Sequence, residues 1–363
     1  FRCIFRTNDM KGRLLIFISL MLASCRGADR SIEESSSAYA RYFDILDNPV
    51  RVVVMSPYDA AADTLLIDRS LDNLICMSSS HVAALSAIGA DSVITAVSGI
   101  RYISDPAIRQ RWRETESGME GNPLYDIGYE ADLDYERIMK LKPDLLLTYT
   151  VSGAEPQYII KLRSLGIPVL VLHDHLEEHP LARAEYLRLF GALTGRQQQA
   201  DSLFNIVSER YNELCDNELE SSKRLLLNIP YGDAWYIPGG ESYMAQLVRD
   251  AGGEVLGAVP GASRSSVITM EQAYILSQDA DIWLNPGHCR TREELSRIHQ
   301  LFPKFGPLAD GLPIYNNTLR TTPEGGNDFW ESGAVRPDLI LEDLRNIISG
   351  NQPDSLNYYI KVD

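Results

Sequence analysis

Residues Gln197–Leu219 have the sequence QQQADSLFNIVSERYNELCDNEL, and the architecture of the whole chain follows from this segment. Its apolar residues recur every three or four positions, which is the spacing of an amphipathic α-helix; they are Ala200, Leu203, Phe204, Val207, Tyr211 and Leu214. A helix of this length extends for roughly 35 Å. It follows Leu193-Thr194-Gly195 and contains no glycine of its own. We therefore expect one long, stiff helix that can join two separate lobes.

Short apolar strands alternate with helices on both sides of this segment. Before it, the sequence predicts strands at 50–55, 63–67, 74–77, 92–97, 144–149 and 169–172, and helices at 82–88, 133–141, 159–165 and 181–193. After it, we expect strands at 224–229, 234–237, 281–284 and 312–315, and helices at 243–251, 269–276 and 336–348. Nearly continuous apolar strands that alternate with helices form parallel sheets with both faces covered. The predicted fold is α/β, with two Rossmann-like lobes of mainly parallel sheet joined by a single long α-helix.

The two halves share a sequence pattern, which indicates duplicated lobes. Gly89–Gly99 (GADSVITAVSG) corresponds to Gly252–Gly261 (GGEVLGAVPG). Glu136–Asp144 (ERIMKLKPD) corresponds to Glu271–Asp279 (EQAYILSQD). The two pairs occur in the same order, and the glutamate in each precedes an expected strand.

The N-terminus has the pattern of a secretory signal. Met10 is followed by Lys11 and Arg13, by the apolar run Leu14–Leu22, and then by Ala-Ser-Cys ending at Cys25. The apolar run is too short to span a bilayer, which needs about 20 residues. Leu-Ala-Ser-Cys resembles the lipobox of bacterial lipoproteins, which implies cleavage before Cys25 and acylation of that residue.

These features divide the chain. We assign 1–25 to the signal peptide and lipobox, with 1–9 upstream of the start, and 26–38 to a flexible tether. The N-terminal lobe is expected at 39–178, the helical connection at 179–221 and the C-terminal lobe at 222–363. The formal net charge of −16 makes nucleic acid an improbable partner, because such a surface repels phosphate. Besides Cys3 and Cys25 there are only three widely spaced cysteines, which suits neither a disulfide framework nor zinc.

Several segments together resemble one protein family. They are Ala87-Ile88-Gly89-Ala90, Asp126-Ile127-Gly128, Leu141-Lys142-Pro143-Asp144-Leu145, Leu165-Gly166-Ile167-Pro168-Val169, Leu193-Thr194-Gly195 and Ala251-Gly252-Gly253. From about Val52 to Ile348 the chain resembles the periplasmic binding proteins for ferric siderophores, haem and cobalamin, whose lobes are joined by a rigid long helix.

The resemblance implies a function in uptake. It implies the substrate-binding component of an ABC importer, a non-enzymatic and monomeric lipoprotein held at the bacterial membrane on the periplasmic side by its acyl anchor. The ligand would be a metal chelate, with a ferric siderophore or haem favoured and cobalamin also considered, and no resident cofactor is expected. The partner would be a permease dimer with its ATPase.

The ligand site is expected outside the carboxyl ends of the parallel strands, between the lobes. Aromatic rings suit flat or catecholate ligands, and arginines pair with anionic oxygen. Residues of these types follow strands in both lobes: Arg101, Tyr102, Tyr129 and Tyr149 in the first, and Trp235, Tyr236, Tyr243, Arg264, His288, Arg320 and Trp330 in the second.

Two glutamates begin equivalent helices. Glu136 follows Asp134, and Glu271 follows Thr269 in a capping-box pattern with Gln272. An acid in the first turn also stabilises a helix through its dipole. In the resembling family, glutamates at these places pair with permease arginines, so we expect Glu136 and Glu271 to dock the permease.

Other readings stay open. His173 and His175 flank an aspartate and form a weaker candidate for a bare divalent metal ion. Pro238–Ser242 (PGGES) precedes a helix and could cradle an anion on backbone N–H groups. A secreted chelatase or metal-dependent hydrolase on the same scaffold is the enzymatic alternative, although neither GxSxG nor HExxH occurs.

Overall fold

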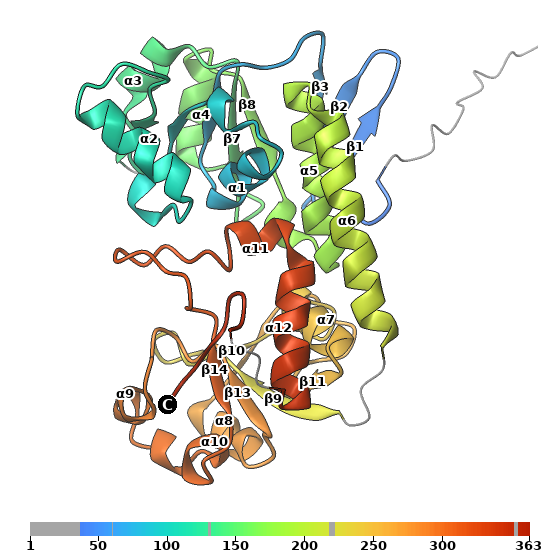
Figure 1. The fold of residues 1–363 in the computed structure, drawn as a ribbon, viewed down its shortest axis with the longest axis vertical. Coiled ribbons are helices and arrows are strands. Elements are labelled where there is room, and N and C mark those ends of the chain that lie inside the picture. The colour runs from blue at the N-terminus through green and yellow to red at the C-terminus, as the bar shows by residue number, and fades with distance from the viewer. Residues whose placement is uncertain (1–36, 60, 130–131, 218–221, 352–354) are drawn as a thin grey trace, which may run out of the picture. The chain divides into compact units, whose positions relative to one another are not determined.

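The computed structural model describes residues 37–59, 61–129, 132–217, 222–351 and 355–363 (Figure 1). The expected signal segment, Cys25 and nearly all of the expected tether lie outside these residues. The described residues belong to one compact unit.

The first lobe is built on a five-stranded sheet in which every neighbouring pair is parallel. Its spatial order is β6 (Tyr125–Asp126), β5 (Ile94–Val97), β4 (Leu74–Cys76), β7 (Leu145–Tyr149) and β8 (Val169–Leu172). Its helices are α1 (Ser79–Ala87), α2 (Pro106–Glu116), α3 (Tyr135–Leu141) and α4 (Gln157–Ser164). The sequence reading missed α2, although Asp105 caps it and Pro106 opens it.

The second lobe repeats this arrangement. Its sheet has the order β11 (Gly253–Val255), β9 (Lys223–Leu227), β13 (Ile282–Leu284), β14 (Ile314–Asn316) and β15 (Ile360–Lys361). Only the last pair is antiparallel. Its helices are α7 (Tyr243–Asp250), α8 (Met270–Ser277), α9 (Arg292–Ile298) and α10 (Gly306–Ala309). In both sheets the first strand lies inside the sheet and pairs with the next strand of that sheet on one side: β4 pairs with β5 and β7, and β9 pairs with β11 and β13. The orders differ at one edge, because β6 extends the first sheet beyond β5 whereas β11 is itself the edge of the second.

Four helices lie between and beside the two sheets. They are α5 (Pro180–Thr194), α6 (Gln197–Asp216), α11 (Ser332–Val335) and α12 (Pro337–Ser349). Helix α6 packs against α5 and α12, as Figure 1 shows, and it is the long helix that the sequence predicts. It has 20 residues and ends at Asp216, three residues before the expected end. Gly195, at φ 69°, ends α5 and lets the chain turn directly into α6.

Two small antiparallel sheets complete the fold. The N-terminal sheet consists of β1 (Phe43–Leu46), β2 (Arg51–Met55) and β3 (Ala62–Leu66). Strand β10 (Trp235–Ile237) pairs with β12 (Ser266–Ile268) in the second lobe. Short 3₁₀ turns lie at Asp91–Val93, Ile100–Tyr102, Asp174–Leu176 and Phe302–Lys304.

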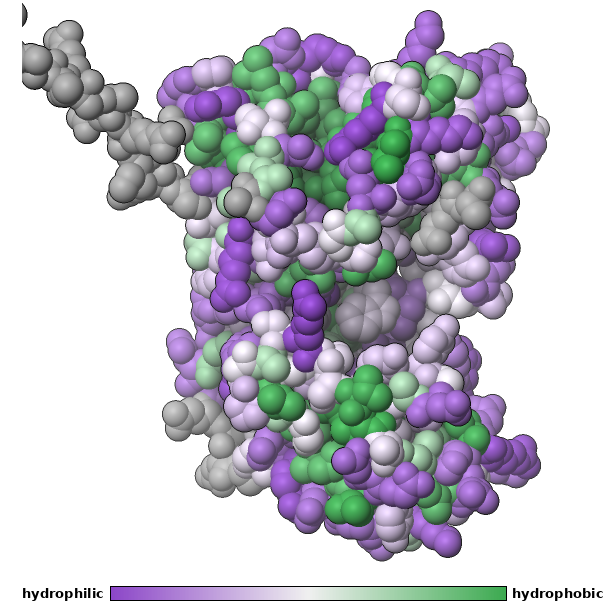
Figure 2. Space-filling model, turned by 180° about the vertical axis from the view of Figure 1, so that it is seen from behind, coloured by the Kyte–Doolittle hydropathy of each residue, from purple (hydrophilic) through white to green (hydrophobic). Residues whose placement is uncertain are grey.

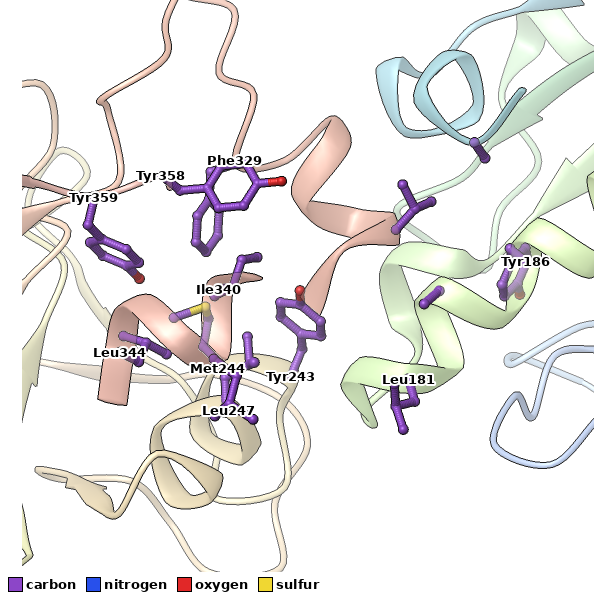
Figure 3. Packing of buried hydrophobic residues seen from close by; sticks show 14 of the residues in the cluster. Leu181, Tyr186, Tyr243, Met244, Leu247, Phe329, Ile340, Leu344, Tyr358 and Tyr359 are labelled. Carbon is purple, nitrogen blue, oxygen red and sulfur yellow. The ribbon is translucent and has the colours of Figure 1, made fainter. Parts of the chain in front are cut away.

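One large hydrophobic core continues from the first lobe through α5 and α6 into the second. Figure 3 shows its central part, where Met244 and Leu247 of α7 lie beside Ile340 and Leu344 of α12. Cys76 and Cys289 are buried and free, and Cys215 is half-buried. No helix among the described residues is both long and apolar enough to cross a membrane.

Candidate functional site

A cleft of about 760 Å³ opens where the two lobes meet, and we call it the central cleft. Figure 2 shows a hollow at this level of the surface. Residues of the N-terminal sheet, the first lobe and the second lobe all line it: Tyr42, Pro57, Tyr58, Val151, Ser152, Gly153, His175, Leu176, Glu177, Glu178, Arg183, Pro238, Ser242, Tyr243, Met244, Ser263, Arg264, Ser265 and Trp330. Three of the predicted ligand residues are among them: Tyr243, Arg264 and Trp330.

An arginine of α5 and a tyrosine of α7 meet in this cleft. The Arg183 guanidinium lies 3.7 Å from the centroid of the Tyr243 ring, which is a cation–π contact. Arg183 also donates from Nη2 to the carbonyl oxygen of His175 at 2.7 Å, so its direction is set from the first lobe. Burial raises the pKa of Tyr243 to about 12. The phenol is neutral at pH 7 and can donate a hydrogen bond.

The two carboxylates that line the cleft, Glu177 and Glu178, already accept hydrogen bonds from other parts of the protein. Glu177 is only 1% exposed and accepts the backbone N–H groups of Arg41 and Tyr42. Burial raises its pKa to about 7, although these hydrogen bonds favour the charged form. Glu178 accepts from the Arg41 guanidinium and from the hydroxyl of Ser263, which belongs to the second lobe. These two carboxylates therefore hold protein segments in place.

Aromatic side chains gather on the first-lobe side of the cleft. Tyr42, Tyr58 and His175 line it, whereas His173 and Tyr149 contact these residues from outside the lining. The Tyr42 and Tyr58 rings meet the His173 ring in T-shaped contacts, with centroids 6.2 and 6.1 Å apart. Tyr149, a predicted ligand residue, is 5.5 Å from the His175 ring in the same geometry. Burial lowers the pKa of His173 to about 4, and it lowers that of His175 as well. Both imidazoles are neutral at pH 7, which leaves this aromatic group uncharged.

The bare-metal reading of His173 and His175 finds no supporting ligand set. Within the described ranges, no group of three or more histidine, cysteine, aspartate or glutamate side chains is placed to hold a metal ion. Asp174, which lies between them, accepts instead from Ser80 Oγ at 2.8 Å and contacts His81 Nε2 at 3.3 Å. It thereby ties the start of α1 to the turn that carries His175.

The other predicted ligand residues lie outside the residues that line the central cleft. Arg101, Tyr102 and Tyr129 form an exposed group in which the Arg101 guanidinium is 4.9 Å from the Tyr102 ring. His288 lies in a separate hollow of about 400 Å³. Arg320 pairs with Asp328 at 3.1 Å and lines another hollow. Tyr236 is exposed on β10.

Trp235 belongs to the core of the second lobe. It is 1% exposed, stacks on Trp283 and Phe305, and donates its indole N–H to the carbonyl oxygen of Leu227. It has no face left for a ligand, because strand β10 turns Trp235 inward and its neighbour Tyr236 outward.

The anion cradle that Pro238–Ser242 suggests is occupied by the chain itself. The N–H groups of Gly240 and Glu241 donate to the carbonyl oxygens of Val259 and Ala262. A Cβ atom at Gly239 would overlap the carbonyl oxygen of Ala262. The glycines therefore allow two backbone segments to pack closely, and these N–H groups are not available to an anion.

Both docking candidates are exposed in the first turns of short helices. Glu136 lies on α3, where Asp134 accepts from the backbone N–H of Arg137. Glu271 lies on α8, where Thr269 and Gln272 form the predicted capping box. Neither glutamate lines the central cleft, so both are accessible to a partner protein.

Sequence reasoning missed three main cleft residues, Tyr42, Tyr58 and Arg183. One feature of the sequence could have identified Arg183 as a site residue. It lies in the first turns of a helix that is otherwise largely apolar, and a buried arginine needs a partner. Tyr42 and Tyr58 precede or interrupt strands, and no local pattern connects them with residues almost two hundred positions later.

Comparison with known proteins adds the following. An uncharacterized lipoprotein of Methanocaldococcus jannaschii is 22% identical over 287 residues, covering 78% of this chain and 66% of the relative. The chain thus spans just under two thirds of that relative. A periplasmic binding protein from Veillonella parvula has a TM-score of 0.59 at 12% identity, over 83% of this chain and 98% of that one.

Two further solved structures have the same fold. The periplasmic heme binding protein HutB of Vibrio cholerae matches with a TM-score of 0.55 at 18% identity, over 74% of this chain and 98% of that one. The triscatecholate siderophore binding protein FeuA from Bacillus subtilis, complexed with ferri-bacillibactin, matches with a TM-score of 0.54 at 14% identity, over 80% and 96%.

The sequence profile of one family matches residues 74–301, which is more than half of the 363 residues. That segment contains both glutamates, the long helix and much of the central cleft. The two-lobed α/β architecture and this match lead to one conclusion: the chain belongs to the periplasmic binding protein family.

Proposed function

We propose that this protein captures a metal chelate in the central cleft and delivers it to an ABC permease, with a ferric siderophore or haem as the favoured ligand and a corrinoid as the third candidate. One observation carries the proposal. Aromatic rings and arginines from both lobes converge on a cleft of about 760 Å³, notably Tyr58, Arg183, Tyr243, Arg264 and Trp330.

The chemistry of the cleft favours a chelate over a bare ion. Hard and borderline metal ions need several carboxylate, thiolate or imidazole ligands, and the described residues bring no such group together. The acidic side chains of the cleft are engaged by protein donors. A chelate supplies the metal's ligands itself and presents flat rings and anionic oxygen, which suit aromatic faces and guanidinium groups.

The structural relatives support the same ligand class. One is a heme binding protein and another is a siderophore binding protein with its ferric ligand. At 18% and 14% identity these relatives show that the fold is shared, and they do not distinguish between the two ligands. Titration decides between them.

Titration of the purified protein with haemin, a ferric tris-catecholate and cyanocobalamin tests the proposal. Trp330 is 46% exposed and lines the cleft, whereas Trp235 and Trp283 are buried. Binding of one chelate should therefore quench tryptophan fluorescence, and Trp330→Phe should remove much of that quenching. Recovery of the ligand intact after release is the expected result for a binding protein. Zinc binding that His173→Ala abolishes, without any chelate binding, would contradict the proposal.

Delivery requires a membrane partner. We propose that Glu136 and Glu271 contact arginines of a permease dimer that works with an ATPase, and that the anchor at Cys25 keeps the monomeric protein at the membrane. The exposure of both glutamates on helices that correspond in the two lobes supports this assignment.

A further inference from the structure

One wall of the central cleft comes from outside the segment that matches the family. The family match begins at residue 74, whereas Tyr42, Pro57 and Tyr58 line the cleft. Tyr42 directly precedes β1, and Tyr58 lies in the turn between β2 and β3. The N-terminal sheet thus adds two phenol rings to a cleft whose other walls lie almost wholly within the matched segment.

The ring of Tyr58 is fixed by contacts with the first lobe. Its hydroxyl lies 3.5 Å from the carbonyl oxygen of Thr150. Its ring and Cβ pack on Gly153, where an added Cβ atom would approach them to 3.3 Å. A side chain at position 153 would therefore press on the Tyr58 ring, and Gly153 leaves room for it.

The position of Tyr42 is fixed by two buried carboxylates. Glu185 accepts the backbone N–H groups of Ala38, Tyr39 and Ala40 at 2.7–2.8 Å. Glu177 accepts those of the next two residues, Arg41 and Tyr42, at 2.9 and 3.0 Å. Five consecutive N–H groups thus bind two carboxylates that are at most 1% exposed. Hydrogen bonds to a carboxylate are short and strong, and here they offset part of the cost of burying the two side chains.

We call Glu177 and Glu185, together with the five N–H groups of residues 38–42 that they accept, the N-terminal clamp. This clamp shares residues with the central cleft. Glu177 and Tyr42 both line the cleft and both take part in the clamp. The two phenol rings both contact His173, the neutral imidazole just after β8. An N-terminal segment that served only to connect the body with its anchor would need neither a clamp of five N–H groups nor two rings aimed at the cleft.

We propose that Tyr42 and Tyr58 contact the ligand and determine which chelate the cleft accepts, and that Glu185 acts as a positioning residue for Tyr42. This inference rests on the proposed function. The rings supply stacking faces and the hydroxyls supply hydrogen-bond donors to anionic ligand oxygen. The N-terminal sheet is then the part of the chain that adapts a common two-lobed scaffold to its own ligand.

The test compares affinities for haemin, a ferric tris-catecholate and cyanocobalamin across matched variants. Tyr42→Ala and Tyr58→Ala should each weaken binding of the preferred ligand about tenfold, as expected for loss of a stacked ring. Tyr42→Phe and Tyr58→Phe keep the rings and should weaken it about threefold. Tyr231→Ala, at a tyrosine that is 84% exposed and does not line the cleft, is the control and should bind as wild type does.

Glu185→Gln tests positioning separately. It should change the ratio of the three affinities in the same direction as Tyr42→Ala, which a general loss of stability would not do. If an alanine variant fails to fold, Tyr42→Leu and Tyr58→Leu take its place, because leucine removes the aromatic face and keeps an apolar side chain. Unchanged affinity in the leucine pair would overturn the role of the rings, and unchanged affinity in the phenylalanine pair would overturn the role of the hydroxyls.

The outcomes separate this inference from the proposed function. Wild-type affinities in all tyrosine variants of the N-terminal sheet, combined with a loss in Tyr243→Ala, would overturn the inference and leave the proposed function standing. Wild-type protein that binds none of the three chelates would overturn both.

Discussion

Glu331 links the two lobes and should make the stability of the protein depend on pH. It lies just before α11 in the second lobe, is 1% exposed, and accepts the backbone N–H groups of Ser104 and Asp105 in the first lobe at 2.6 and 2.8 Å. Burial raises its pKa from the ordinary value of 4.5 to about 7, and the charges of Asp328 and Asp105 act in the same direction. The two hydrogen bonds oppose this rise only partly.

The sign follows from proton binding. Between the unfolded pKa of 4.5 and the folded pKa of about 7, the folded protein binds more protons at Glu331 than the unfolded chain does. The contribution of Glu331 to stability is therefore fully present below pH 4.5 and is lost as the pH rises through 7. A rise of roughly 2.5 units at 1.36 kcal/mol per unit corresponds to about 3 kcal/mol of unfolding free energy.

The perturbation is Glu331→Gln, which keeps the shape and removes the titration. Urea unfolding of both proteins at pH 5, 6, 7 and 8 gives the difference between their unfolding free energies. Because part of the titration lies below pH 5, we expect this difference to shift by roughly 2.5 kcal/mol in favour of the variant between pH 5 and pH 8. We compare the variant with wild type at each pH because Glu177, whose pKa is also raised to about 7, makes the unfolding free energy of both proteins fall with pH in a similar way. Subtraction removes this shared contribution.

Glu293→Gln is a suitable control, because the Glu293 side chain is 73% exposed. Its difference from wild type should stay nearly constant with pH. A constant difference for Glu331→Gln, or a shift in favour of wild type at high pH, would refute the reasoning.

Three further predictions concern anchoring, motion and docking. Cys25→Ala should move the protein from the membrane to the soluble fraction, because acyl chains contribute about 0.8 kcal/mol per CH₂ to membrane binding; a variant that stays with membranes would contradict the lipobox interpretation. Small-angle scattering profiles with and without ligand should nearly coincide, because the hydrogen bonds of α6 resist bending; a decrease of several ångströms in the radius of gyration would contradict a stiff connection. Glu136→Ala and Glu271→Ala should leave ligand affinity and melting temperature almost unchanged while impairing transport and ATPase stimulation in reconstituted vesicles, more so together; normal transport by the double variant would argue against docking through these residues.

Much of the fold was predictable because its signals are local. A glycine, a proline or a capping side chain acts within one or two helical turns, so the ends of α5 and the start of α8 could be expected from Gly195 and Thr269. The interlobe helix was predicted from the period of its apolar residues, and the repeated pattern indicated two lobes that are each built on a mainly parallel sheet. Helix α2 was not predicted, although the local signals for its start, the Asp105 cap and Pro106, are present in the sequence.

The candidate site was predicted only in part. Tyr243, Arg264 and Trp330 were expected from the rule that ligands bind beyond the carboxyl ends of parallel strands. The same rule selected Trp235, which the fold turns into the core, because a three-residue strand does not reveal which of its faces will be covered. The rule names an edge of a sheet, and it does not say which side chains along that edge remain exposed.

The sequence by itself therefore determined the elements, their repetition and the two-lobed class. Only the tertiary structure decided that Tyr42 and Tyr58 share a cleft with Tyr243, and that Glu185 and Glu177 bind five N–H groups about 140 positions earlier in the chain. The difference arises from the separation along the chain of the residues that interact. Periodicity and capping depend on neighbours a few residues apart, whereas these contacts form only after sheet order and helix packing have brought distant segments together.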